Sequence, residues 1–377
     1  MNYDFSEKEF LFFLRIHELA AQVAGESEIT SIADLELAMR NILPLLAETP
    51  YLTLGIEPVS GMSPMLAATA AAEAFSAVAP TLCLAIEMSV RVFGRAVSRW
   101  GESAVKKEYL EGIKAGKCIG AVALSEAGVN IENEPLSASG VTDGDRVVVN
   151  GRKQYVVNAG IADVIAVAGF LDGRRALFLV DRGNPGLKVE NPVNTFGFDG
   201  LDMAAVLLED CEIPADRVIV GPEKPDMFAM LRHWENQAIC GVSLGLSKSA
   251  FEAAKDYAKS HKSGGKPIIA FQEVGFAIAE MLTLYQTAQL LAYRAAWTDD
   301  DNPSQGPELT LCAKIFCTEG AEQIAGQALR ILGGYGHVRK NPAELALRSA
   351  KYCQVFGTST EIARVKLGGA AMGIRVL

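Results

Sequence analysis

The chain has 377 residues, of which 50% are hydrophobic and 21% are charged, a composition typical of a globular protein with a sizeable buried core. Its formal net charge is −10, from 45 acidic and 35 basic residues. Because phosphate binding needs a basic surface, this charge argues against nucleic acid as the main partner.

The cysteines and the first residues indicate the compartment. The chain has seven cysteines, an odd number, and they are scattered with no two in a C-x-x-C pair. We therefore expect free thiols in a reducing compartment. The four histidines lie far apart and form no metal-ligand pattern. No run of about 18 apolar residues occurs, and the start of the chain lacks the basic region of a signal peptide. We therefore expect a cytoplasmic protein without a membrane segment.

Residues 1–118 are expected to form an N-terminal helical domain. Apolar residues recur at three- and four-residue spacing in 6–24, 32–46 and 103–115, which is typical of helices with one buried face. Residues 65–79 are rich in alanine and apolar nearly all round, so they predict a fully buried helix.

The pattern changes at residue 119, and residues 119–222 predict a middle β-domain. Short β-branched runs alternate with turn residues, and the sequence Asp143-Gly144-Asp145 predicts a hairpin. The expected strands are 138–141, 147–150, 155–157, 164–169, 176–181 and 205–208.

Residues 223–377 return to helical periodicity and are expected to form a C-terminal helical bundle. Its expected helices are 227–258, 271–297, 308–332 and 342–353, and TDDDNPSQGP at 298–307 predicts a loop. Gly241 and Gly245 are spaced for close helix packing in the core. Because the strands cluster between two helical blocks, we expect an α+β fold with an antiparallel middle domain rather than a doubly wound sheet.

Five segments, in chain order, resemble the acyl-CoA dehydrogenase family. AVALSEAGVNIE at 121–132 resembles its A-x-x-x-T-E-P-x-A-G-S-D segment, and GRKQYVVNAGIAD at 151–163 resembles its G-x-K-x-W-I-T-N-x-x-x-A-D segment. The end of the family's β-domain is matched by residues 198–214, and its F-G…Q helix by residues 262–281. Its Q-x-x-G-G-x-G to E-G-T-S-x-I-Q-R stretch is matched by residues 330–364. The resemblance spans nearly the whole chain and implies this family's fold. Taken alone, GGYG at 333–336 would predict a helix C-cap as readily as a phosphate loop.

The resemblance implies FAD bound between the β-domain and the C-terminal helices, normally in a homotetramer. A flavin needs hydrogen-bond partners at its ring edge, a wall against its face and donors for its pyrophosphate. By register, Leu124 and Ser125 would meet the ring edge, and Tyr155 would cover one face where the family usually has tryptophan. His261 and Ser263 would reach the FAD phosphates of a neighbouring subunit. The remaining positions that fall at FAD contacts are Gln272, Arg330, Gly333, Gly334, Ser359 and Glu361.

Some positions depart from the family's pattern. Val157 replaces the threonine whose hydroxyl would donate to flavin N5, so that bond is lost. Ile131 and Asn236 fall at positions that bear on the substrate, the first within the altered P-x-A-G-S run and the second in place of an arginine.

The family's reaction removes an α-proton from an acyl thioester while a hydride leaves Cβ for the flavin, so a carboxylate must reach Cα. Most members use the glutamate of Y-E-G-T. Here Gly357 or, after a shift by one residue, Phe356 stands in that place. A minority, including isovaleryl-CoA and crotonobetainyl-CoA enzymes, carries the base ten residues before the second glycine of an A-G-x-x-G-like segment. Counting back from Gly245 leads to Glu235.

We therefore predict Glu235 as the catalytic base, on an apolar helix where burial should raise its pKa. The alternative is a solvated glutamate in the first turn of a helix, favoured by the helix dipole. Gly357 keeps its backbone N–H, which the family uses with a flavin ribityl hydroxyl to bind the thioester carbonyl.

The leading hypothesis is FAD-dependent α,β-dehydrogenation of an acyl-CoA thioester, or the reverse reduction, with electron-transferring flavoprotein as the electron partner. An acyl-carrier-protein thioester is an alternative substrate. Two other functions stay open: a non-catalytic subunit that completes a related partner's site in a heteromer, and a flavin monooxygenase on the same fold.

Overall fold

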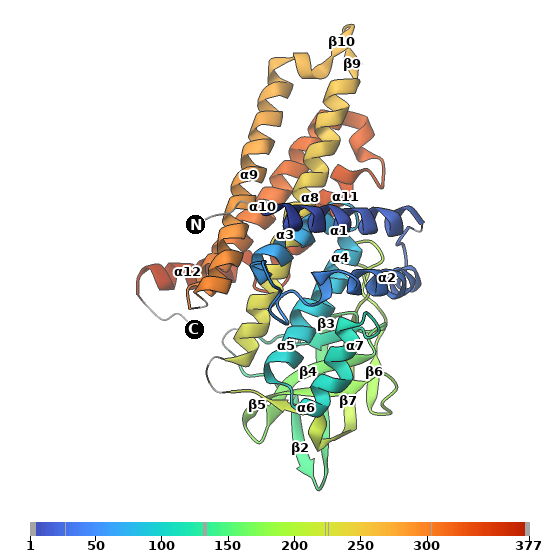
Figure 1. Ribbon diagram of the computed structural model, residues 1–377, viewed down its shortest axis with the longest axis vertical. Helices are drawn as coiled ribbons and strands as arrows, with labels where there is room; N and C mark the ends of the chain where they lie inside the picture. Colours follow the sequence, from blue (N-terminus) through green and yellow to red (C-terminus); the bar gives the residue numbers. More distant parts are fainter. Residues whose placement is uncertain are drawn as a thin grey trace.

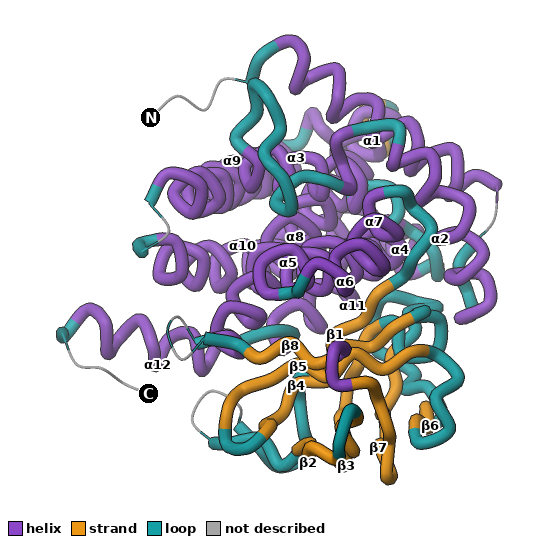
Figure 2. Tube along the Cα trace, turned by 60° about the horizontal axis from the view of Figure 1, so that its bottom comes forward, coloured by secondary structure: helices purple, strands orange, loops and turns teal. Residues whose placement is uncertain are grey.

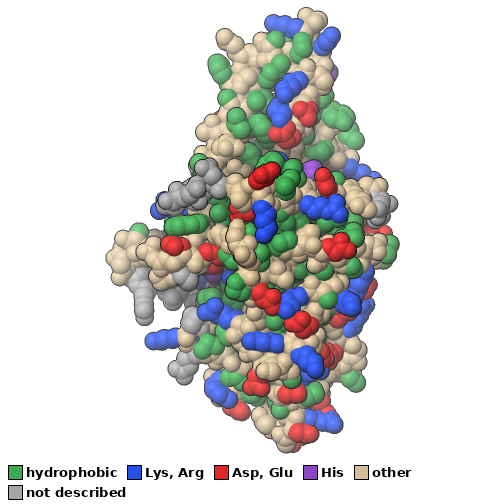
Figure 3. All heavy atoms as spheres, in the orientation of Figure 1, with side chains coloured by type: hydrophobic (Ala, Val, Ile, Leu, Met, Phe, Trp, Pro, Cys, Tyr) green, Lys and Arg blue, Asp and Glu red, His purple; other side chains and the backbone are tan. Residues whose placement is uncertain are grey.

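The computed structural model describes residues 5–26, 28–130, 134–222, 224, 226–302 and 304–373. It has a helical N-terminal part, a central β-sheet domain and a helical C-terminal part, as the sequence predicts. In Figure 1 the long C-terminal helices rise from one end and the sheet lies at the other. Figure 2 shows the strands gathered on one side of the molecule, with helices of both blocks covering the other. Lys, Arg, Asp and Glu side chains are interspersed over the face drawn in Figure 3.

The N-terminal part consists of packed helices. Ser31 and Asp34 form a capping box that starts one of them, since each side chain accepts from the other's backbone N–H. A π-helical segment, η2 (Met88–Gly94), joins α4 to α5 into one continuous rod. The helices are α1 (Glu7–Glu26), α2 (Ile32–Ala47), α3 (Pro64–Ser76), α4 (Pro80–Glu87), α5 (Arg95–Trp100), α6 (Ser103–Val105) and α7 (Glu111–Lys114), with a short turn η1 (Pro50–Leu52) and a second π-helical segment η3 (Lys106–Leu110) that joins α6 to α7.

The sheet is mixed rather than purely antiparallel. The strands are β1 (Gly120–Ala123), β2 (Ser139–Asp143), β3 (Arg146–Val157), β4 (Val164–Leu171), β5 (Arg174–Asp181), β6 (Leu187–Val189), β7 (Met203–Pro214) and β8 (Val218–Val220). They are ordered β6-β7-β3-β2-β4-β5-β8, with β1 beside β4. Most pairs are antiparallel, but β1 and β2 each pair with β4 in parallel. The predicted Asp143–Asp145 hairpin joins β2 to β3, with Asp143 opposite Arg146.

Strand β3 differs from the prediction because it is one strand where two were expected. Its pairing with β7 shifts register between Val149 and Gly151 and again between Lys153 and Val156. A bulge interrupts the two-residue alternation of side chains while the strand continues. The sequence pattern therefore predicted two strands, 147–150 and 155–157, where the structure has one.

The C-terminal part is a bundle of long helices. It contains α8 (Met227–Ser260), α9 (Gln272–Asp301), α10 (Gly306–Leu332), α11 (Pro342–Val355) and α12 (Thr360–Ala371), with the small hairpin β9 (Lys262–Ser263) and β10 (Lys266–Pro267) and short turns η5 (Ile268–Ala270) and η6 (Gly333–His337). The short turn η4 (Ala215–Arg217) belongs to the sheet domain, between β7 and β8. A Cβ built on Gly245 would lie 1.9 Å from Ser76 Oγ, and one on Gly241 would lie 2.8 Å from Ala72 Cβ. These glycines therefore let α8 pack closely on α3, as their spacing predicted.

The predicted loop at 298–307 begins later than expected, because α9 continues to Asp301. Asp299 Oδ1 lies 2.8 Å from His233 Nε2, and Asp300 accepts from Ser63 Oγ at 2.5 Å and from Met65 N at 2.9 Å. These tertiary contacts hold residues 298–301 in the helix against their weak helix propensity.

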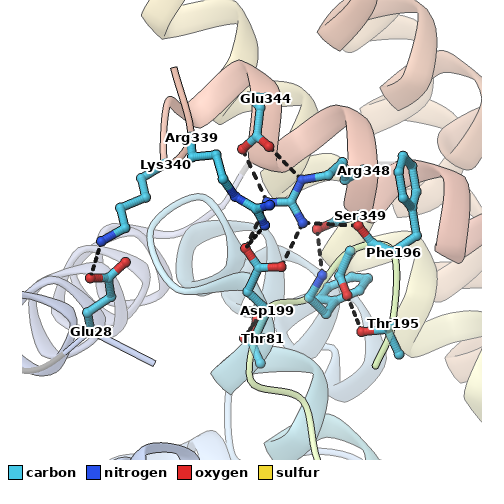
Figure 4. Close-up of polar contacts among 12 residues, drawn as sticks. Glu28, Thr81, Thr195, Phe196, Asp199, Arg339, Lys340, Glu344, Arg348 and Ser349 are labelled. Carbon is cyan, nitrogen blue, oxygen red and sulfur yellow. Dashed lines mark hydrogen bonds and ion pairs between the residues drawn. The ribbon is translucent and has the colours of Figure 1, made fainter. Parts of the chain in front are cut away.

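A polar network ties the three parts of the chain together (Figure 4). Asp199, in the loop before β7, accepts two bonds from Arg348 of α11, at 2.6 and 2.7 Å. Its backbone carbonyl accepts from Thr81 of α4 at 3.2 Å. Lys340 pairs with Glu28 at 2.6 Å across the same region. Within the described ranges, none of the helices combines the length and apolar character needed to span a bilayer.

Candidate active site

Glu235 is buried on α8, nine residues into the helix, with 7% of its surface exposed. Its Oε2 accepts from Arg232 Nη1 at 2.8 Å. Arg232 Nη2 also donates to Ser125 Oγ at 2.8 Å, so the arginine joins the carboxylate to the segment that follows β1. The alternative of a solvated first-turn glutamate does not agree with this position. Glutamate is among the side chains that act as general bases; burial raises the pKa of a carboxyl, and a paired cation lowers it.

Gly357 lies directly beside this carboxylate, in the turn between α11 and α12. A Cβ built on it would lie 3.6 Å from Glu235 Cβ and 2.6 Å from Asn236 Oδ1. Its φ is +65°, a conformation that favours glycine. Among the hydrogen bonds of the described residues, none uses the Gly357 N–H as donor, so this group is free to bind a ligand. The structure therefore brings together the two residues predicted for catalysis.

Asn236, predicted to bear on the substrate, is 2% exposed, and its side chain contacts the same turn. Its Nδ2 donates to Thr358 Oγ1 at 3.0 Å, and its Oδ1 accepts from Thr358 N at 3.0 Å. The amide thus joins the turn to the helix that carries Glu235. Ile131, the other predicted substrate contact, lies outside the described residues.

The predicted flavin contacts of the β-domain lie close together in the chain's strands. Ser125 O accepts from Gln154 N at 2.9 Å, which places the end of β1 beside β3. Tyr155 occupies the second bulge of β3 with φ +56°, and the residue is 60% exposed. Val157 is buried and pairs with Met203. Leu124 is also buried, and its carbonyl accepts from Lys153 Nζ at 3.4 Å.

A buried ion pair beneath these residues was not predicted. Lys153 Nζ lies 2.6 Å from Glu126 Oε1, and both side chains are almost completely buried. Burial lowers the pKa of Lys153 to about 8, although the hydrogen bond and charge of Glu126 oppose that shift. Glu126 also accepts from Ser137 N at 2.7 Å and from Ala138 N at 3.0 Å, so it orders the chain after β1. Its place within the segment at 121–132 was the only sequence signal.

Six of the remaining predicted FAD contacts lie at the far end of α8. His261 stacks on Tyr257 at 4.6 Å between ring centroids, and Tyr257 stacks on Tyr335 of the glycine turn at 5.7 Å. His261 follows Glu235 by 26 residues, which is about 39 Å along a helix. Figure 1 shows β9 and β10 at the tip of the bundle, away from the sheet. Ser263, Gln272, Arg330, Gly333 and Gly334 are exposed around this end.

Within one chain, these tip residues therefore lie far along α8 from Glu235. That His261 and Ser263 serve a neighbouring subunit stays a prediction. The other two predicted FAD contacts, Ser359 and Glu361, lie at the start of α12, directly after the Gly357 turn. Ser359 caps this helix by accepting from Ile362 N at 3.3 Å, and Glu361 is exposed in its first turn.

The residues present fit the chemistry of FAD. Ser125 supplies a hydroxyl for a ring edge, and the exposed Tyr155 ring supplies an aromatic wall. A Cβ built on Gly333 or Gly334 meets nothing within 4 Å, so the glycine turn leaves its backbone open to a phosphate-sized group.

A cavity of about 960 Å³ lies where the N-terminal helices, the loop before β7 and the segment before α11 meet. Its lining comes from residues in 23–33, 78–82, 192–201 and 339–345. None of the predicted catalytic or FAD-contacting residues lines it, so it is separate from the Glu235 site.

Comparison with known proteins gives the family. Residues 121–211 match the model for the acyl-CoA dehydrogenase middle domain, and residues 230–372 match that for the acyl-CoA dehydrogenase C-terminal domain. Human mitochondrial short-chain specific acyl-CoA dehydrogenase is 31% identical over 281 residues, which are 72% of this chain and 68% of that protein. A probable acyl-CoA dehydrogenase of Bacillus subtilis, YngJ, is 29% identical over 71% of this chain and 72% of its own.

Solved structures have the same fold. Butyryl-CoA dehydrogenase from Megasphaera elsdenii superposes with a TM-score of 0.87 at 20% identity, over 99% of this chain and all of that one. Glutaryl-CoA dehydrogenase from Mycobacterium smegmatis gives a TM-score of 0.90 at 20% identity, over 99% and 96%. The predicted family, fold and cofactor are confirmed: this chain belongs to the acyl-CoA dehydrogenase family, whose members are FAD-dependent oxidoreductases acting on CH–CH bonds.

Proposed function

We propose that this protein catalyses α,β-dehydrogenation of an acyl-CoA thioester, or the reverse reduction, with Glu235 as the base. One observation carries this proposal: the buried Glu235 carboxylate lies beside Gly357, whose N–H is free to bind a carbonyl. In the forward reaction the Glu235 carboxylate takes the α-proton, and the Gly357 N–H binds the thioester oxygen as negative charge develops there. FAD, when bound, supplies the hydride acceptor.

Arg232 gives the base its orientation in this proposal. Its guanidinium holds Glu235 Oε2 at 2.8 Å and is itself fixed by Ser125 Oγ at 2.8 Å. A planar guanidinium with two fixed partners restricts the rotamers of the carboxylate, so the proton acceptor is in place before the substrate arrives. Tyr155 provides an aromatic surface for the cofactor ring at the end of β3.

The substrate, the partners and the compartment are also proposals. The family supports an acyl-CoA thioester, and an acyl-carrier-protein thioester remains the alternative carrier. We propose a homotetramer in the cytoplasm, with tip residues His261 and Ser263 completing a neighbour's FAD site. We propose an electron-transferring flavoprotein as the electron partner. One solved structure with this fold, 24% identical, is described as an electron transferring flavoprotein of Acidaminococcus fermentans. The non-catalytic and monooxygenase alternatives gain no support from the geometry of Glu235.

The test is anaerobic titration of the FAD-loaded protein with a panel of acyl-CoAs, following the flavin absorbance band. We expect the wild type to bleach with at least one thioester. Glu235→Gln should bind FAD and thioester but lose flavin reduction by about 10²–10⁴-fold, the usual contribution of a general base.

Glu73→Gln is the matched control. Glu73 is a buried glutamate of α3 that accepts from Tyr293 OH at 2.7 Å and from Gln289 Nε2 at 2.8 Å, neither of which is a predicted site residue. We expect this variant to bleach at the wild-type rate. Flavin reduction that survives in Glu235→Gln would refute the assignment of the base, and a wild type that takes up no FAD would refute the self-contained enzyme.

A further inference from the structure

Lys314 is a completely buried lysine whose ammonium group contacts the turn that carries Gly357. It lies on α10, and its Nζ donates to Gln354 O at 2.8 Å and to Thr358 O at 2.5 Å. These two carbonyls flank Gly357, one in the last turn of α11 and the other just before α12. The ammonium group therefore joins both sides of the turn to α10.

Within the described residues, this buried charge is compensated by hydrogen bonds to two carbonyls. Burial lowers the pKa of Lys314 to about 8. The groups that face it are Cys353 of α11, Cys240 of α8, Glu361 of α12 and Glu319 of α10. Within the described residues, Lys314 forms no ion pair within 4 Å. A buried ammonium held only by carbonyls is costly, and an apolar side chain would fill the same space at lower cost.

The hydrogen bonds around Gly357 leave one peptide group unpaired. Lys314 binds the carbonyls of the 354–355 and 358–359 peptides. The N–H of the 355–356 peptide donates to Tyr352 O at 3.1 Å, and that of the 357–358 peptide donates to Asn236 Oδ1 at 3.0 Å. Only the 356–357 peptide between them, which carries the Gly357 N–H, lacks a partner among the described residues.

We infer that Lys314 is a positioning residue that fixes the Gly357 N–H toward the thioester carbonyl, acting from α10 while Asn236 acts from α8. A glycine with φ +65° has a low barrier to alternative conformations. Rotation of the 356–357 peptide would turn a carbonyl toward the bound thioester and remove the donor. The peptides on both sides of Gly357 are held by hydrogen bonds and therefore oppose that rotation. This inference rests on the proposed function, because it assumes a thioester carbonyl at the Gly357 N–H.

The test measures polarisation of the carbonyl rather than turnover. The FAD-loaded protein is mixed with enoyl-CoAs of four to eight acyl carbons, labelled with ¹³C at the thioester carbonyl, and the carbonyl stretch is recorded by difference infrared spectroscopy. We expect a shift to lower frequency in the wild type and in Glu235→Gln, since the N–H donates whether or not the base is present. In Lys314→Met at least half of this shift should be lost.

Turnover gives a second readout. In Lys314→Met, kcat should fall about tenfold or more while KM changes less than threefold, because the oxyanion donor acts mainly in the transition state. Lys314→Arg, which keeps the charge and the donors, should recover part of both signals.

Thr318→Val is the control for packing defects in α10. Thr318 is buried one turn from Lys314, and its Oγ1 donates to Lys314 O at 2.8 Å without contacting the Gly357 turn. We expect it to lower the thermal midpoint without changing the carbonyl stretch. If Lys314→Met keeps the full shift, the positioning role is refuted while the proposed function stands. If the wild type shows no shift with any of the thioesters, the carbonyl site of the proposed function fails.

Discussion

Replacing Asn236 by leucine should measure how strongly α8 holds the Gly357 turn. The substitution keeps a similar volume but removes the bonds to Thr358 Oγ1 and Thr358 N, both 3.0 Å long. Thr358 is 2% exposed, so water does not replace the lost acceptor. An unsatisfied buried N–H costs about 1–3 kcal/mol, and the lost hydroxyl bond adds about 1 kcal/mol. We therefore expect the free energy of unfolding to fall by roughly 2–4 kcal/mol.

The assay is urea unfolding at fixed protein and FAD concentrations, because ligand binding and association shift the midpoint. Thr358→Val removes the hydroxyl bond and keeps the N–H, so it should cost only about 1 kcal/mol. A double-mutant cycle then separates the two contributions. An Asn236→Leu variant that loses no more stability than Thr358→Val would refute the claim that the Thr358 N–H depends on Asn236.

Two further predictions concern Gly357 and the carboxyl group of Asp299. Gly357→Ala should lose about 2–4 kcal/mol of unfolding free energy, because the strained φ costs roughly 1–3 kcal/mol and the new Cβ would lie 2.6 Å from Asn236 Oδ1. Gly144→Ala, with φ +62° but open space around it, should lose about 1 kcal/mol in the same urea assay, and equal losses would contradict the clash. Burial would raise the pKa of Asp299, but the hydrogen bond and charge of His233, with the charge of Arg95 and the hydrogen bond from Gln237, together outweigh it, and the pKa falls to about 2. The lowered pKa of Asp299 stabilises the folded state by roughly 2 kcal/mol above about pH 4, and this stabilisation is lost as the pH falls to 2. In Asp299→Asn the free energy of unfolding should therefore depend less on pH over that range.

The regular elements could be predicted because their apolar periodicity is local. The C-terminal helices and the Asp143–Asp145 hairpin agree with the expected positions within a few residues. The errors arose where tertiary contacts decide the structure. Asp299 and Asp300 extend α9 through bonds to residues of α8 and α3, and bulges join two expected strands into β3. The parallel pairing of β1 with β4 depends on how the sheet is assembled, which no local pattern records.

The candidate site, too, could be predicted only in part from the sequence. Glu235 was predicted from the family's pattern, by counting back ten residues from Gly245, and its role as the base stays a proposal; the structure places it beside Gly357. Lys314 and Arg232 were missed because their partners could not be inferred from residue types. Lys314 binds two backbone carbonyls, and Arg232 bridges Glu235 to a serine 107 positions earlier in the chain.

The glycine at 357 and the glutamate at 235 are best understood as one arrangement. A side chain at 357 would begin 3.6 Å from Glu235 Cβ and 2.6 Å from Asn236 Oδ1, in a turn with φ +65°. A second carboxylate there would meet the first in a buried site, where like charges raise each other's pKa and displace the Asn236 bonds. A carboxylate on α8 avoids this conflict, because the helix backbone fixes its position and Arg232 balances its charge. It also leaves the Gly357 turn to the N–H donor alone. The two positions therefore constrain each other, and a Gly357→Glu variant that keeps Glu235 should lose stability without gaining a second base.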